Sequence, residues 1–520
     1  MMRVITRILG LTVLSLSFAN GASDGMISGT VKGPAGAPFR GAFVQARNPE
    51  TRMTVSVLSD SQGRYQVRNL PPGAYELRAK AIGYGDDQRS EVNVADGKSL
   101  HMDFSLQNGK VRWSDLTSHQ GKKLLPEGKG KEVLMGKCFA CHQFQSRIAA
   151  KAPRNAAGWA AGIEMMRRTI KYRMRNVTDA DAAEMTAYLT KHFGPNSELP
   201  SPSDMPGYSE LVRPVSDEAL NMVYVDYEMP MPNRFPWSAA PDNKGNFWIP
   251  FFGAANRIGR LDPATGEVEE FAVPFQENAA GVHSTFPTPD GAVWLGEQGT
   301  NRIGRWDPVT RKITEYVDTD GGGKVTVRVN QEGIVWGSGK LSRFDPKTGQ
   351  FTHYPEIPSS YSISIDKDGN AWFSVLADGN SIGRADAKTG KVTRWAPPTP
   401  NAYPRRMAFD SQGFLWFGEY RSGKIGRFDP KTETFQEYPL PGANPTPYAL
   451  NVDRNDRIWY SSMDMNVVGR LDPKTGKVIE YPFPYSENTM REFFLDSQGR
   501  MWFGSPANNR VGYFMPSNLQ

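Results

Sequence analysis

The residues with the clearest chemistry lie in one short segment, Cys138-Phe139-Ala140-Cys141-His142. It contains both cysteines of the 520-residue chain and one of its six histidines. Two thiols separated by two residues, with a histidine directly after the second, form the C-x-x-C-H pattern of c-type haem attachment. Each thiol can bond one vinyl group of the porphyrin, and His142 can then ligate the iron. We therefore predict one covalent haem c, held by Cys138, Cys141 and His142.

Two other kinds of site use closely spaced cysteines. A thioredoxin-like dithiol would occupy a βαβ unit and does not need His142. Half of a zinc site would need a second pair of ligands nearby, and the sequence around Cys138 offers none. Haem attachment accounts for all three residues of the pattern.

Helical periodicity surrounds the motif. It begins near Lys131, and a final helix is expected over 180–192. The Tyr188-Leu189 pair in that helix, followed by Phe193-Gly194, resembles the closing helix of a small class I cytochrome c. The resemblance covers 126–195 and implies a small all-α cytochrome c domain with one haem.

The sixth ligand of the iron is less defined than the fifth. Met174 lies just before the last helix, where class I cytochromes usually place an axial methionine. Met166 belongs to an apolar helix stripe, where a methionine is more often a core residue than a ligand. His119, His192 and a pentacoordinate iron remain alternatives. A thioether opposite histidine would raise the potential and suit electron transfer, whereas an open position would permit binding of small molecules.

The first residues have the features of a secretory signal. In 1–23, Arg3 and Arg7 precede an apolar run and a group of small residues. That run is too short to span a membrane, and no later run approaches the necessary length. We expect a protein without a transmembrane segment, exported to the periplasm, the cell surface or the medium of a bacterium.

The segment 24–108 has short period-2 runs separated by Gly and Pro, which predict an antiparallel β-sandwich. The stretch Ser59-Asp-Ser-Gln-Gly-Arg-Tyr65, followed by Leu70-Pro-Pro-Gly-Ala-Tyr75, resembles the carboxypeptidase regulatory-like domain, a transthyretin-like sandwich. The resemblance implies an accessory module for docking or spacing, often grouped with carbohydrate-binding-like folds.

After a linker over 196–220, the segment 221–520 contains an internal repeat with a period of about 42 residues. Its central tryptophans are Trp248, Trp294, Trp336, Trp372, Trp416, Trp459 and Trp502. Seven periods of four short strands predict a seven-bladed β-propeller. The chain as a whole is therefore expected to be multidomain and mainly β.

Two details of the repeat lead to further predictions. The last period lacks its outer strand, while Asn221 to Glu228 is a strand-like run with no blade before it. We expect this run to complete the last blade and so remove an open edge. The third period is short, with Trp336 and Leu341 only five residues apart, and we expect the haem domain to dock beside it.

The blade signature Trp416-Phe417-Gly418-Glu419 to Lys424-Ile425-Gly426-Arg427 resembles the virginiamycin B lyase family. In that family a metal-assisted elimination opens a cyclic depsipeptide, using histidines at the channel ends of inner strands and a glutamate. Here only His283 could stand for a family histidine, and arginine or tyrosine occupies the later positions. A Mg²⁺ site of His283 with Glu297 or Glu419 is the corresponding expectation, with one imidazole and distant carboxylates.

The same end of the propeller supports another interpretation. Arginine forks match carboxylates well, so these side chains could line a pocket for an anionic ligand. They could equally be polar side chains that fill a channel mouth. The residues concerned are His283, Arg405, Arg406, Glu419, Tyr448 and Arg491.

The charge distribution indicates the kind of partner. The net charge is +6, and 110–194 alone contains sixteen Lys or Arg against seven Asp or Glu. Such a segment would attract an acidic redox partner protein, and no nucleic-acid-binding pattern recurs.

The preferred function is electron transfer by a monohaem c-type cytochrome whose propeller binds a donor, a partner or a small ligand. The alternatives are a metal-dependent lyase with accessory haem, and a non-catalytic scaffold that binds a carbohydrate or a partner.

Overall fold

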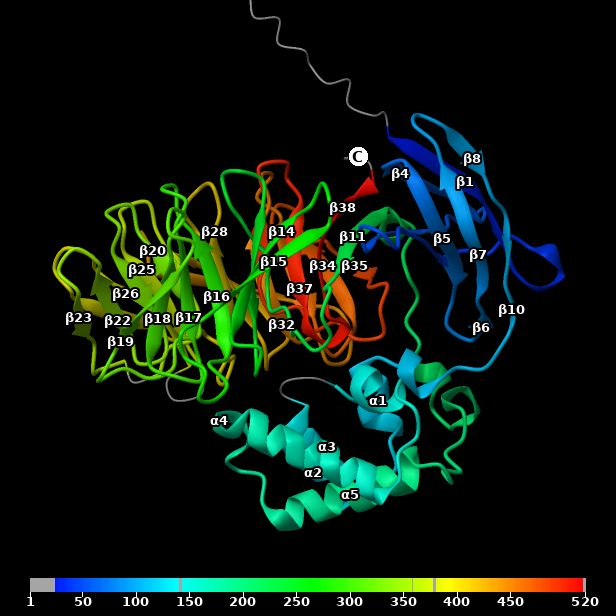
Figure 1. Cartoon of the computed structure of the whole chain (residues 1–520), viewed down its shortest axis with the longest axis horizontal. Coiled ribbons are helices and arrows are strands. Elements are labelled where there is room, and N and C mark those ends of the chain that lie inside the picture. Colours follow the sequence, from blue (N-terminus) through cyan, green and yellow to red (C-terminus); the bar gives the residue numbers. More distant parts are fainter. Residues whose placement is uncertain (1–23, 140–142, 358, 377–379, 518–520) are drawn as a thin grey trace, which may run out of the picture.

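The structure is a computed structural model that describes residues 24–139, 143–357, 359–376 and 380–517. The segment interpreted as a secretory signal, 1–23, lies outside the described residues. Figure 1 shows a β-sandwich beside one edge of a propeller, with a helical domain below both. The expected multidomain, mainly β class is confirmed.

The sandwich consists of two main sheets and one short strand pair, formed by the first ten strands. β1 is the centre of one sheet, antiparallel to β4 and parallel to β8 and β9, and its alternate residues Ile27 and Val31 are buried. The second sheet has the order β3-β2-β5-β7, and β6 pairs with β10. The strands are β1 (Gly25–Lys32), β2 (Phe43–Arg47), β3 (Met53–Leu58), β4 (Arg64–Leu70), β5 (Gly73–Lys80), β6 (Tyr84–Gly85), β7 (Asp87–Val94), β8 (Ser99–His101), β9 (Phe104–Ser105) and β10 (Gln107–Asn108).

The helical domain has five α-helices around one apolar core. Thr178 caps the last of them, because its hydroxyl oxygen accepts a hydrogen bond from the Asp181 amide at 3.1 Å. None of the helices in the described part of the chain is long and apolar enough to cross a membrane. The helices are α1 (Ser118–Leu124), α2 (Lys129–Val133), α3 (Ala156–Thr169), α4 (Lys171–Met174) and α5 (Asp179–Phe193), with π-helical turns at Leu134–Cys138 and Gln145–Ala149.

The propeller has seven four-stranded antiparallel blades, as the repeat predicts. Blades one to three are β12 (Ala240–Pro241), β13 (Phe247–Phe251), β14 (Arg257–Asp262) and β15 (Glu267–Ala272); β16 (Val282–Pro287), β17 (Val293–Glu297), β18 (Arg302–Trp306) and β19 (Ile313–Val317); and β20 (Val327–Val329), β21 (Val335–Gly337), β22 (Ser342–Asp345) and β23 (Gln350–His353). Blades four to six are β24 (Ile363–Ile365), β25 (Ala371–Val375), β26 (Ser381–Ala385) and β27 (Val392–Trp395); β28 (Pro404–Phe409), β29 (Leu415–Glu419), β30 (Lys424–Asp429) and β31 (Thr434–Pro439); and β32 (Pro447–Val452), β33 (Ile458–Ser462), β34 (Val467–Leu471) and β35 (Val478–Pro482). Blade seven is β36 (Phe493–Leu495), β37 (Met501–Ser505), β38 (Arg510–Pro516) and β11 (Met222–Glu228).

A repeated hydrogen bond explains the tryptophan spacing. In blade four the indole nitrogen of Trp372 donates to Asp366 at 2.9 Å, and that aspartate also accepts hydrogen bonds from its own turn. The tryptophan of the second strand is thereby joined to the turn before it, and its ring packs between neighbouring blades. The same bond joins Trp248 to Asp242, Trp416 to Asp410, Trp459 to Asp453 and Trp502 to Asp496.

The ring closes through the strand that precedes the first blade. Each innermost strand contacts the next one, and β36 contacts β12. β11 pairs antiparallel with β38 from Met222↔Pro516 to Glu228↔Arg510. The prediction that 221–228 completes the last blade is therefore confirmed.

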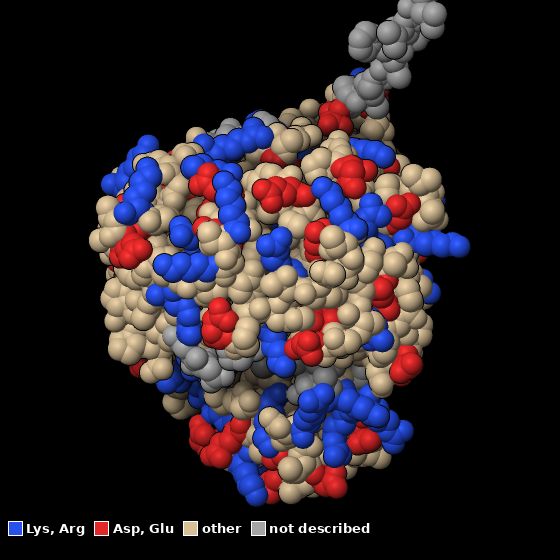
Figure 2. All heavy atoms as spheres, turned by 90° about the vertical axis from the view of Figure 1, so that its left-hand side faces the viewer, with Lys and Arg blue, Asp and Glu red and all other residues tan. Residues whose placement is uncertain are grey.

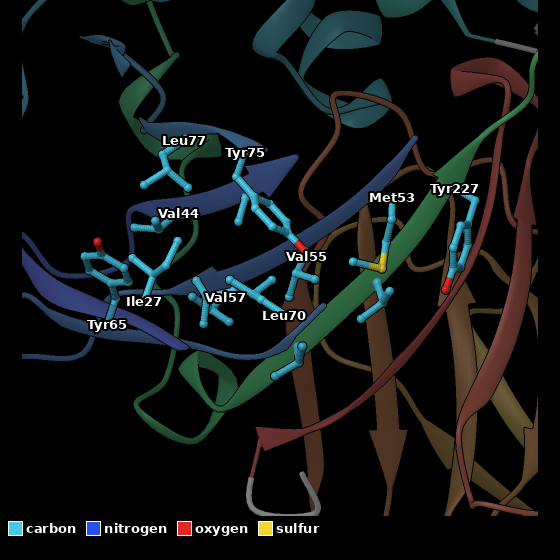
Figure 3. Close-up of a cluster of buried hydrophobic side chains, with 14 of the residues drawn as sticks. Ile27, Val44, Met53, Val55, Val57, Tyr65, Leu70, Tyr75, Leu77 and Tyr227 are labelled. Atoms are coloured by element: carbon cyan, nitrogen blue, oxygen red, sulfur yellow. The ribbon is translucent and has the colours of Figure 1, made fainter. Parts of the chain in front are cut away.

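The other edge of β11 pairs with the sandwich, which the sequence did not indicate. Tyr224 to Tyr227 align antiparallel with Ser56 to Met53 of β3, so blade seven and one sandwich sheet form a continuous eight-stranded sheet. Figure 3 shows Met53 and Val55 of the sandwich in the same apolar cluster as Tyr227 of β11. The sandwich is thus built into the propeller rather than attached by a linker.

Candidate functional site

The helical domain covers the end of the propeller at which the innermost strands begin. Glu487, in the loop before β36, is buried and accepts hydrogen bonds from the Gln143 amide at 2.6 Å and the Ser146 hydroxyl at 2.6 Å. Arg147 donates to the Pro506 carbonyl at 3.1 Å and lies over the Phe235 ring. The turn that follows the C-x-x-C-H motif is therefore fixed to blades seven and one.

A second attachment joins α1 to blade six. The Lys122 ammonium lies 2.6 Å from the buried Asp464 carboxylate, and the His119 amide donates to the Asp464 carbonyl at 2.9 Å. Among the described residues, none of the hydrogen bonds between these two domains reaches blade three. The expectation that the helical domain docks beside that blade was wrong, because buried carboxylates in the loops of blades six and seven form the contact instead.

Of the three haem-attachment residues, the structure describes Cys138; Cys141 and His142 lie outside the described residues. Cys138 ends the π-helical turn after α2, is half-buried, and has its sulfur 3.4 Å from that of Met185 on α5. Phe139 beside it is buried in the same apolar core. A thiol at the edge of an apolar core, three residues before a second thiol that an imidazole follows, fits covalent attachment of haem c.

The possible sixth ligands lie at different depths. Met174 ends α4, is half-buried and packs against the apolar core that contains Phe139, whereas Met166 is half-buried on α3. The backbone amide of His119 takes part in the contact with blade six, and the His192 ring lies against Tyr188. Met174 is therefore better placed than Met166 to reach a group attached at Cys138.

Four arginines and several tyrosines meet at the propeller end that faces the helical domain. We call Tyr361, Tyr403, Arg405, Tyr420 and Tyr448 the Arg–Tyr cluster. The guanidinium of Arg405 lies 4.3 to 5.2 Å from the centres of all four rings, and it donates to the Tyr448 hydroxyl at 2.8 Å. The hydroxyls of Tyr361 and Tyr448 are hydrogen-bonded to each other. The predicted pair Arg405 and Tyr448 is thus in direct contact.

Arg406 and Arg491 lie between this cluster and the axis of the propeller, with the Arg491 guanidinium over the Tyr448 ring. Arg406 is buried and reaches across the ring, donating to the Arg491 carbonyl at 2.9 Å and to the Thr326 hydroxyl at 2.7 Å. Its guanidinium and that of Arg328 share the buried carboxylate of Glu492. Burial opposes ionisation of Glu492, but the two guanidinium groups lower its pKa. Arg406 therefore fills the channel, as the simpler interpretation expects, while Arg405 stays at its mouth.

The environment of Tyr448 is unusual for a tyrosine. Burial alone would raise its pKa, but the charges of Arg405 and Arg491 lower the pKa to about 7. The pKa of its partner Tyr361 moves the other way, to about 12, chiefly because of burial. The two arginine charges therefore favour the phenolate form of Tyr448.

His283 lies beside this cluster, but the two glutamates do not. The His283 ring is buried 5.0 Å from that of Trp237 and 6.2 Å from that of Tyr361. Glu297 accepts a hydrogen bond from Thr300 at 2.8 Å, and burial followed by the charge of outer-strand Glu315 raises its pKa to about 8.

Glu419 repeats this arrangement in blade five. Its carboxyl accepts a hydrogen bond from the Ser422 hydroxyl at 2.6 Å, and burial raises its pKa to about 7. Outer-strand Glu437 lies close enough to contribute to this shift. The structure therefore does not bring Glu297 and Glu419 together with His283 as a ligand set. No three His, Cys, Asp or Glu of the described chain are grouped so that they could hold a metal ion.

Comparison with known protein families gives a match for two of the three domains. Residues 355–518 match the model of the Virginiamycin B lyase family, and residues 26–107 match the model of the carboxypeptidase regulatory-like domain. The propeller is similar to virginiamycin B lyases. The resemblances to the carboxypeptidase regulatory-like domain and to the virginiamycin B lyase family are thereby confirmed. Neither match includes the helical domain, so its resemblance to cytochrome c stays a prediction.

Solved structures give the same relationship for the lyase-like propeller. A streptogramin B lyase is 25% identical, with a TM-score of 0.53 over 58% of this chain and 99% of its own. The virginiamycin B lyase of Staphylococcus aureus is 23% identical, with a TM-score of 0.51 over 56% of this chain and 98% of its own. No curated protein sequence matches the chain.

Sequence reasoning missed several residues of this region. Met185 could have been found, since it lies four residues before Leu189 on the buried face of the last helix. Glu487 and Glu492 lie in and beside a loop without periodicity, so no local pattern marks them. Tyr420 follows the noted Glu419, and its role depends on a contact with Arg405 in another strand.

Proposed function

We propose that this protein is an exported monohaem c-type cytochrome that transfers electrons, and that its lyase-like propeller positions the electron donor. The observation that carries the proposal is the attachment of the turn after the C-x-x-C-H motif to Glu487. This attachment holds the turn that follows the motif against the propeller end with the Arg–Tyr cluster. A donor bound there would lie next to the haem.

The chain's own residues would divide the work. Cys138 and Cys141 would hold the haem, and His142 and Met174 would ligate its iron. When bound, the haem supplies one-electron oxidation and reduction. Glu487 fixes the backbone beyond His142 through two short hydrogen bonds to its carboxylate. The basic surface of the helical domain, seen in the lower lobe of Figure 2, would attract an acidic redox partner protein.

The first test is the absorption spectrum of the holoprotein, produced in a host with haem-maturation machinery. We expect a sharp α band on reduction, and haem that stays on the chain after denaturation. A Cys138→Ser/Cys141→Ser variant should lose both features, whereas Met165→Leu, which changes an exposed methionine of α3, should keep them. A colourless wild-type protein would refute the proposal.

A second function is favoured by the lyase similarity of the propeller. Under it, the propeller opens a cyclic depsipeptide with the help of a metal ion, and His283 takes part. The test is Mg²⁺-dependent linearisation of a streptogramin B by the holoprotein. Activity that disappears in His283→Ala would support the lyase, and an unreacted depsipeptide would exclude it.

A further inference from the structure

The Arg–Tyr cluster has a closed side and an open side. Tyr361 and Tyr448 are 7% and 3% exposed, whereas Arg405, Tyr403 and Tyr420 are half-buried. The guanidinium of Arg405 thus lies between aromatic rings, in a residue that keeps some exposed surface. Such an arrangement can take a flat ligand against the rings and a hydrogen-bond acceptor against the cation.

The described residues around the cluster carry more positive than negative charge. Arg328, Arg405, Arg406 and Arg491 meet there, and Glu492 pairs with two of them. Arg405 has no carboxylate partner among the described residues, and its buried Nε atom has no hydrogen-bond acceptor there. A guanidinium without a carboxylate partner can offer its N–H groups to an anion, so this cluster favours an anionic ligand while Tyr448 is neutral.

We propose that the Arg–Tyr cluster binds a small organic carboxylate, which accepts hydrogen bonds from Arg405 and lies against the rings of Tyr403 and Tyr420. The inference rests on the proposed function in one respect, because it takes the propeller as the place where the donor binds. Guanidinium groups pair with carboxylates in a planar fork, which an ammonium group cannot reproduce. Binding itself does not involve the haem.

Tyr448 makes this binding depend on pH. Its hydroxyl is faced by Arg405 and Arg406 of β28, Tyr361 before β24, Tyr420 after β29, and Arg491 before β36. Below pH 7 the tyrosine is neutral, and Arg405 is available to the carboxylate. Above pH 7 the phenolate competes for Arg405, so ligand binding requires uptake of a proton. The affinity should then fall by up to about tenfold per pH unit.

The test is isothermal titration calorimetry of the holoprotein with benzoate, with neutral benzamide as the matched probe. At pH 6 we expect benzoate to bind and benzamide to give no signal. Arg405→Gln should weaken benzoate binding at least tenfold. Arg405→Lys keeps the charge, so it should bind benzoate more tightly than Arg405→Gln but more weakly than the wild type. Arg454→Gln, an exposed arginine elsewhere on blade six, should bind as the wild type does.

A second variant tests the role of the phenolate. Tyr448→Phe should bind benzoate with the same affinity at pH 6 and pH 9, because the competing anion is gone. Equal binding of benzamide, absence of benzoate binding, or unchanged binding in Arg405→Gln would overturn the proposal. The haem spectrum is recorded on the same samples: haem without benzoate binding refutes only this inference, and benzoate binding without haem refutes only the proposed cytochrome.

Discussion

The amide of Gln143 donates a 2.6 Å hydrogen bond to the carboxylate of Glu487, which is 344 positions further along the chain. Ser146 donates to the second oxygen of the same carboxylate through its hydroxyl. One buried propeller side chain therefore fixes the turn that follows the C-x-x-C-H motif. The geometry around the motif depends on the propeller as well as on the helical domain.

Replacing Glu487 should loosen this turn. Each hydrogen bond to a charged group contributes about 1.5 to 3 kcal/mol, so Glu487→Ala should speed amide exchange of 143–147 at least tenfold. Hydrogen–deuterium exchange followed by mass spectrometry measures this change, with exposed Glu356→Gln as the control. Unchanged exchange in 143–147 would mean that the helical domain orders the turn by itself.

Removing the charge of Arg510 should destabilise the joint between sandwich and propeller. Arg510 lies 2.6 Å from Asp226, which is fully buried on β11 and also accepts a hydrogen bond from Tyr485. Arg510→Met leaves that carboxylate without its cation, at a cost of about 3 to 5 kcal/mol. Urea unfolding should show this loss, and the exposed Arg68→Met should not.

The same experiment tests whether the sandwich and the propeller unfold together. Because β11 pairs with both β3 and β38, we expect near-ultraviolet and far-ultraviolet circular dichroism to report one coincident transition. Two separate transitions in the wild-type protein would show that the joint contributes little.

Glu419 should make stability depend on pH. Burial raises its pKa from 4.5 to about 7, so the folded protein keeps a proton that the unfolded chain releases above pH 4.5. Stability should therefore fall as pH rises through this window, by up to about 1.4 kcal/mol per unit. Glu419→Gln, which is uncharged throughout, should flatten this part of the profile in chemical denaturation, while exposed Glu433→Gln should leave it unchanged.

The sixth ligand of the proposed haem can be assigned by substitution. Met174 packs against the core that contains Phe139, whereas Met166 lies on α3 without such a contact among the described residues. Met174→Ala should lower the haem potential and change the oxidised spectrum, because a thioether ligand favours the reduced iron. Met166→Ala should change neither property. The reverse result would exchange the two roles.

Much of the fold could be predicted because its signals are local and repeated. The seven tryptophans mark equivalent second strands, and five of them donate to an aspartate six residues earlier. Counting strands per repeat then located the closing strand at 221–228. The pairing of β3 with β11 could not be predicted, because Met53–Leu58 alternates like any sandwich strand. All six residues of β3 are buried, and the strand that pairs with its edge lies about 170 residues away in the sequence.

The candidate site was less accessible to prediction. Arg405 and Tyr448 were noted because they open inner strands, and they do meet. Glu297 and Glu419 end second strands, and whether such a side chain faces the channel or the outer strands depends on blade twist and on neighbouring hydroxyls. The docking surface of the helical domain depends on isolated loop carboxylates, Asp464 and Glu487, which no sequence pattern distinguishes from ordinary surface residues.

The position of β11 between β3 and β38 also determines the order of assembly. The chain emerges from its N-terminal end, so β3 and β11 are present long before 510–516 are made. Until then β11 has an unpaired edge, and unpaired edges join with those of other chains. We expect chains interrupted before Arg510 to aggregate, and the complete protein to need a chaperone that shields this edge until 510–516 are made.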